Sequence, residues 1–215
     1  FLMAVGHLGS ASTAGITGAT NVYLANSGAL AVDGTVGFAA AANDSFISAA
    51  SLTVNKAVTV TGSFTLQADS DGVNPGNDLT VGANVASSGG NVTLNAGDNV
   101  ALSSGTVSGT TVALNADLDG AGDLAAGSVS ETGGVLTATH VTAQGQGITL
   151  MTSTNSMGTF AAVNGATGII NVFNNGALSL GAITQNGAGV VGITTTGGGV
   201  TQTAALSVGT GTGFD

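Results

Sequence analysis

The sequence predicts an all-β protein built as a parallel β-solenoid, and three observations lead to that class. The 215 residues include 37 Gly, one Pro and only 6% charged residues, although 43% are hydrophobic. Apolar and polar residues alternate in brief segments separated by Gly, Asn, Asp or Ser, which is typical of short strands. A related pentapeptide returns after roughly 20 residues, and strand repeats of that length are typical of stacked β-coils.

The predicted strands are three to five residues long. In each, the two outer apolar residues point to the same face, because strand side chains alternate with a period of two. No long segment has the i, i+3, i+4 spacing of an amphipathic helix, and the Ala run at 39–42 is too short to form one. The clearest strands are residues 52–54, 58–60, 64–66, 79–81, 92–94, 112–114, 148–150 and 178–180.

The pentapeptide sets the length of the repeat. Its copies occupy residues 64–68, 92–96 and 112–116, and the longer first interval indicates a loop inserted at 69–78. A single coil cannot bury its inward Val, Leu and Ile, whereas stacked coils bury them in a continuous column. We therefore expect one solenoid domain over 1–215, with ~20-residue coils, as a fragment of a longer repetitive chain. A β-sandwich is the alternative, but it does not explain the recurring pentapeptide.

Two segments carry a family resemblance. Residues 89–102 (GGNVTLNAGDNVAL) and 175–187 (NGALSLGAITQNG) resemble the repeats of filamentous haemagglutinin-like exoproteins, which are bacterial β-helical adhesins. The resemblance extends over most of the chain from about Leu52. It implies a right-handed parallel β-helix, secretion to the bacterial cell surface, and an adhesive or scaffolding role.

The charged residues exclude several classes of partner. Lys56 is the only basic residue and the formal net charge is −10. Binding to nucleic acid or to anionic lipid depends on Lys and Arg, so we expect neither partner. No stretch approaches the ~20 apolar residues of a membrane helix, so we expect no membrane insertion. Residues 1–6 lack the basic start of a signal peptide, which favours a mature fragment.

Few residues suit catalysis or metal binding. Enzymes that resemble this fold carry Arg, Lys and aromatic residues in a groove, whereas this chain has one Tyr and no Arg, Trp or Cys. His7 and His140 are too far apart in the sequence to form a joint site. The Thr-x-Thr pairs at 59–61, 137–139, 201–203 and 210–212 are too irregular for an ice-binding face. We expect a non-enzyme with no catalytic, cofactor or metal residues.

Two acidic clusters offer the oxygen ligands that Ca²⁺ prefers. One lies in the 69–78 insert and the other follows the third pentapeptide. Neither matches an EF-hand or a glycine-rich Ca²⁺ repeat, and both are typical of solvated Asx turns. Ca²⁺ is thus the one cofactor that these side chains could bind, and we expect none. The clusters are Asp69, Asp71 and Asp78, and Asp117, Asp119 and Asp123.

Together these features predict a structural segment of a secreted or cell-surface filament or adhesin. Neither end of the sequence reads as a polar cap, so we expect the rod to stack on another copy or to continue into further coils. Host or cell-surface ligands are further expected partners. The alternative is a module that binds carbohydrate, a host protein or Ca²⁺ through the 69–78 insert.

Overall fold

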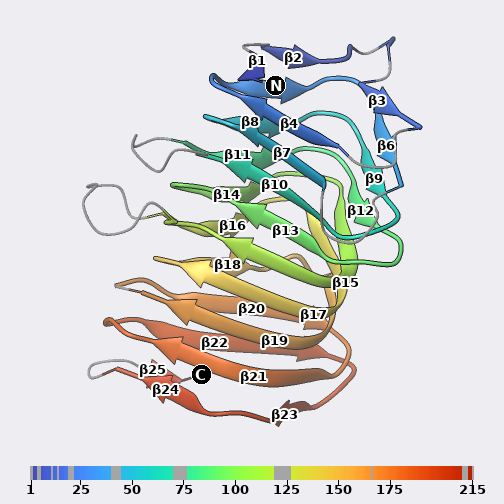
Figure 1. Ribbon diagram of the computed structural model, residues 1–215. Helices are drawn as coiled ribbons and strands as arrows, with labels where there is room; N and C mark the ends of the chain where they lie inside the picture. The colour runs from blue at the N-terminus through green and yellow to red at the C-terminus, as the bar shows by residue number, and fades with distance from the viewer. Residues whose placement is uncertain are drawn as a thin grey trace.

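The computed structural model is all-β, and all pairings between its strands are parallel over the residues that it describes. Figure 1 shows the strands lying one above another from the N-terminal to the C-terminal end. The parallel pairing excludes an antiparallel β-sandwich, the alternative that the sequence left open. The described residues are 2–3, 6–10, 12–13, 15–18, 22–39, 45–69, 77–118, 127–165, 167–209 and 213–214.

A 10-stranded sheet forms one side of the stack, and its strands follow one another in chain order. Each strand pairs with the equivalent strand of the next repeat, so this sheet advances by one strand per repeat. Its strands are β2 (His7–Leu8), β5 (Leu30–Val32), β8 (Leu52–Val54), β11 (Leu79–Val81), β14 (Val100–Leu102), β16 (Val129–Glu131), β18 (Ile148–Leu150), β20 (Ile170–Asn175), β22 (Val190–Thr196) and β25 (Gly213–Phe214).

A 15-stranded sheet supplies the rest of each repeat. Its strands are β1 (Leu2–Met3), β3 (Ile16–Thr17), β4 (Tyr23–Asn26), β6 (Val36–Phe38), β7 (Ser45–Ala49), β9 (Val58–Val60), β10 (Phe64–Ala68), β12 (Val85–Ser87), β13 (Val92–Asn95), β15 (Thr106–Asn115), β17 (Val135–Gly145), β19 (Ser156–Asn164), β21 (Leu178–Gln185), β23 (Val200–Gln202) and β24 (Leu206–Val208).

The 15-stranded sheet changes form at β15. Before β15 it consists of two separate columns of short strands, one ending at β12 and the other at β13. β15 is long enough to pair with both columns, and β17, β19 and β21 continue as strands of 8–11 residues. The expectation of strands of three to five residues is therefore wrong for this part of the chain. Here the polypeptide stays extended where the earlier repeats have a corner.

The pentapeptide register is confirmed. Phe64 pairs with Val92, and Val92 pairs with Val112, so the three copies lie directly above one another. The ~20-residue period holds only for repeats without an insertion. Partners are 19 residues apart at Val129 and Ile148, but 29 apart at Val100 and Val129. That longest repeat contains residues 119–126, a second insertion that the sequence did not predict.

The core consists of side chains stacked in columns. Every segment predicted as a strand lies in a strand, and its outer apolar residues are buried. Leu52, Leu79 and Val100, for example, occupy equivalent positions and are each 0% exposed. Because these side chains lie above one another, each buries the apolar surface of its neighbours along the stack.

Replacing one member of a column should show how much this packing contributes. We expect Leu94→Ala to destabilise the protein by about 2–5 kcal/mol, because Leu94 is fully buried and a cavity would remain. Thr93→Ala is the matched control, since the Thr93 side chain is only partly buried in the same strand. Thermal unfolding followed by circular dichroism measures both. Equal effects of the two substitutions would contradict the columnar core.

Candidate functional site

Hydrogen-bonded polar side chains gather at two corners of the repeats. The first corner follows β10, β13 and β15, where the chain leaves the 15-stranded sheet. Asp69 and Asp117 stand at equivalent positions there, with φ of 58° and 60°. Asp tolerates this left-handed conformation better than most residues. Asp69 begins the insert predicted at 69–78, of which residues 70–76 lie outside the described residues. Asp117 comes shortly before residues 119–126, which also lie outside them.

A chain of hydrogen bonds crosses three repeats at this corner. Asp78 Oδ1 accepts hydrogen bonds from the backbone N–H of Asn99 at 3.1 Å and from Asn99 Nδ2 at 2.9 Å. Asn99 Oδ1 in turn accepts from the backbone N–H and the hydroxyl of Ser128, both at 2.9 Å. These side chains therefore bind the backbone of the neighbouring repeat.

The acidic clusters are only partly described. Asp117 Oδ2 accepts a hydrogen bond from Gln146 Nε2 at 2.8 Å, so this carboxylate also links two repeats. Asp71, Asp119 and Asp123 lie outside the described residues. Within the described part of the chain, no three His, Cys, Asp or Glu side chains gather in a way that could hold a metal ion. The expectation about Ca²⁺ stays a prediction.

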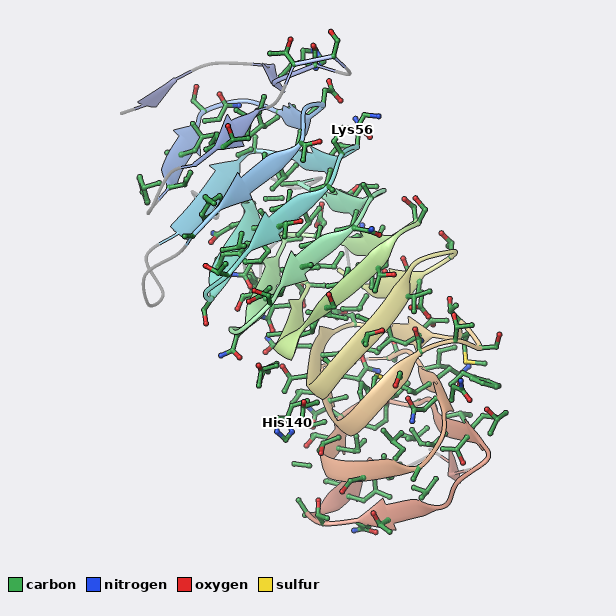
Figure 2. The ribbon with its side chains drawn as sticks, turned by 90° about the vertical axis from the view of Figure 1, so that its right-hand side faces the viewer. Lys56 and His140 are labelled. Carbon is green, nitrogen blue, oxygen red and sulfur yellow. The ribbon has the colours of Figure 1, made fainter. Side chains whose placement is uncertain are left out.

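The two histidines lie in separate surroundings. His7 Nδ1 forms a hydrogen bond with Asp33 Oδ2, and the Asp33 side chain also accepts one from Asn55 Nδ2 at 2.8 Å. Both hydrogen bonds lower the pKa of Asp33, and the bond from Asn55 has the larger effect. His140 is exposed on β17, and Figure 2 shows it far from Lys56 along the stack. The structure does not bring the two histidines together.

The second corner, where the chain leaves the 10-stranded sheet after β16, β18 and β20, contains buried polar residues that the sequence pattern did not indicate. Glu131, Asn155 and Asn174 come from three consecutive repeats, and they are 7%, 0% and 0% exposed. Asn155 Oδ1 accepts a hydrogen bond from the backbone N–H of Leu136 at 2.8 Å. Asn174 Oδ1 accepts one from Met157 N at 2.7 Å. Aligning the repeats on their strands would have revealed Glu131, because it stands where other repeats have Val or Leu.

The outer faces of the sheets carry mainly small and polar side chains. The Thr-x-Thr pairs do not form a single rank, because Thr59 pairs with Ala86 in the next repeat. Residues 210–212 lie outside the described residues. A shallow hollow of about 260 Å³ lies over β17 and β19, with Thr142, Gln144, Ala161 and Val163 in its lining. Its lining consists of small apolar side chains and uncharged polar ones.

Comparisons with family models, with curated proteins and with solved structures found no match for this chain. Within the described part of the chain, no helix has the length and apolar character required to cross a membrane. The geometry of the corners is therefore the guide to what they do. Their polar side chains satisfy backbone groups between repeats, which is a structural task.

The hydrogen-bond chain at the first corner predicts a measurable loss of stability. We expect Asn99→Ala to cost about 1–3 kcal/mol, because it leaves the partly buried backbone N–H and hydroxyl of Ser128 in the next repeat without their acceptor. Asn84→Ala is the control, since Asn84 accepts a similar bond from Thr106 N at an exposed position where water can replace it. Melting temperatures of both variants test this. If Asn99→Ala destabilises the protein no more than Asn84→Ala does, the hydrogen-bond chain contributes little to stability.

Proposed function

We propose that this protein is a right-handed parallel β-helix, a β-solenoid, which serves as a non-catalytic structural rod in a secreted or cell-surface filament or adhesin. The observation that carries the proposal is the parallel register of the 10-stranded sheet. The same pairing recurs from β2 to β25, even where long segments are inserted between strands. A protein in which most side-chain contacts hold successive repeats together is suited to serve as an elongated structural spacer.

The handedness follows from a general rule. Connections between parallel strands of one sheet are right-handed in about 98% of cases, because strand twist favours that direction. Each repeat here is such a connection, since it leaves a strand of the 10-stranded sheet and returns to its parallel neighbour. The resemblance of residues 89–102 to adhesin repeats supports the same hand.

The last complete repeat supports stacking. Val200 pairs with the buried Leu178, and Leu206 pairs with the buried Ile183. These positions face the core in the preceding repeat, yet Val200 is 45% exposed and Leu206 is half-buried. Unpaired strand edges and uncovered apolar side chains favour the addition of another strand. Further coils, either from a longer chain or from a second copy, would cover them.

A surface location is supported by the family resemblance of residues 89–102 and 175–187. Immunogold labelling of intact cells that express the protein tests the location. Label at the cell surface is expected, and label confined to the cell interior would contradict the proposal.

The stacking proposal predicts that charges on the end face reduce association. We expect the purified chain to form concentration-dependent end-to-end rods, and we expect Val200→Lys to shift it toward single rods of about 45–50 Å. Burying a lysine charge between repeats is costly, so the variant should not stack. Sedimentation velocity and negative-stain electron microscopy measure the change.

Thr201→Lys is the matched control for this experiment. Thr201 pairs with Ser179 and is the next residue along the same strand, so its side chain points to the opposite face. The Thr201→Lys variant should therefore leave end-to-end association unchanged. If both variants reduce association equally, the effect is one of net charge alone, and end-to-end stacking through this face is contradicted.

A further inference from the structure

Glu131 occupies a position that other repeats fill with aliphatic side chains. It pairs with Leu102, and Leu102 pairs with Val81 in the preceding repeat. Leu102 and Val81 are at most 1% exposed, and Glu131 is 7% exposed. The carboxyl group therefore points into the core column of the 10-stranded sheet. A charged group is rarely buried unless its partners satisfy it.

The two carboxyl oxygens of Glu131 have different surroundings. Oε2 accepts hydrogen bonds from the backbone N–H of Thr152 at 2.7 Å and from Asn155 Nδ2 at 2.8 Å. Oε1 is buried and has no hydrogen-bond partner among the described residues. A carboxyl group protonated on Oε1 keeps both bonds through Oε2, whereas ionisation leaves a negative charge, shared by both oxygens, on a buried Oε1 that accepts no hydrogen bond from the described residues. The ionised form is the costlier one to bury.

These bonds connect three parts of the structure. Glu131 ends β16, and its partners lie in the turn at 151–155 between β18 and β19. Asn155 also accepts the hydrogen bond from Leu136 N at the start of β17. Loss of the Glu131 contacts would therefore release the turn of one repeat from the strand of the repeat before it.

No other ionisable side chain faces this carboxyl group from the described elements around it. β14, β15, β18, β19 and the turns at 103–105, 132–134 and 151–155 contain no Asp, Glu, Lys, Arg or His. β17 contributes only His140, which is exposed on the outer face. In the sequence, no Asp, Glu, Lys or Arg follows Glu131 until Asp215. Its ionisation is therefore not compensated by a nearby cation.

We propose that Glu131 makes the junction between β16 and the 151–155 turn a pH-sensitive seam in the stack. The seam is closed when the carboxyl group is protonated, and it loosens when the group is ionised. The described strands that precede β16 in the 10-stranded sheet have apolar side chains at equivalent positions and lack this sensitivity. When Glu131 is ionised, such a rod begins to unfold at this one repeat.

The direction of the pH effect follows from the protonation equilibrium. Burial raises the pKa of Glu131 above its ordinary value of 4.5, and hydrogen bonding from the backbone of Thr152 and from the side chains of Asn155 and Thr152 opposes this only in part. The folded state therefore holds its proton to a higher pH than the unfolded state. The resulting stabilisation is complete below about pH 4.5 and is lost as the pH rises through the folded-state pKa.

Thermal unfolding of the full chain between about pH 4 and pH 8 tests the proposal through Glu131→Gln. Gln keeps the shape and accepts the same two hydrogen bonds, but it does not ionise. We expect the wild-type melting temperature to fall by roughly 2–4 °C more than that of the variant over this range. Asp33→Asn is the matched control, because it removes the same charge at a half-buried position whose lowered pKa acts in the opposite direction.

Hydrogen exchange locates the effect. The amides of Thr152 and Leu136 should lose protection in the wild type as the pH rises, after correction for intrinsic exchange, and should not do so in Glu131→Gln. The proposal would be overturned if the melting temperatures of the wild type and of Glu131→Gln change with pH by the same amount. If Glu131→Gln does not fold, an NMR titration of the wild-type Glu131 carboxyl group decides. A pKa at or below 4.5 overturns the seam, and a higher value supports it.

Discussion

Parallel hydrogen bonding between equivalent residues of successive repeats is the constraint on which the rest of this structure depends. Once Phe64, Val92 and Val112 lie in register, every second residue of their strands must face the core. A slip of one residue would expose an entire column of apolar side chains. The register therefore explains why the strands keep an apolar–polar–apolar pattern while the segments between them vary in length.

The corners absorb the variation that the strands do not allow. The insertions at 70–76 and 119–126 follow equivalent strands, and the pairing of β11 with β14 and of β14 with β16 continues unbroken. Loop length has a small entropic effect when the ends are fixed by packing. Asp78 and Asn99 accept hydrogen bonds from backbone N–H groups just before β14 and β16. These bonds hold the start of each strand in place, so an insertion before it does not disturb the neighbouring repeat.

Buried polar groups serve two purposes in this fold. The amides of Asn155 and Asn174 satisfy backbone N–H groups at a corner, and they do so without charge. Glu131 has a similar place in the same set of contacts, but its carboxyl group adds an ionisable member to an otherwise neutral column. The seam proposed for Glu131 and the rod proposed for the whole chain are independent, because the first concerns one junction and the second concerns the repeated register.

The sequence by itself determined the all-β class, the predicted strands and the register of the pentapeptide, because each depends on local alternation of apolar and polar residues. Only the tertiary structure showed the fusion of two strand columns at β15, since a strand of ten residues and two short strands joined by a corner read alike. It also placed Glu131 in the core column and Asp78 beside Asn99. Those contacts join residues about 20 apart in the chain, and inserted segments of unequal length obscure which residues become neighbours.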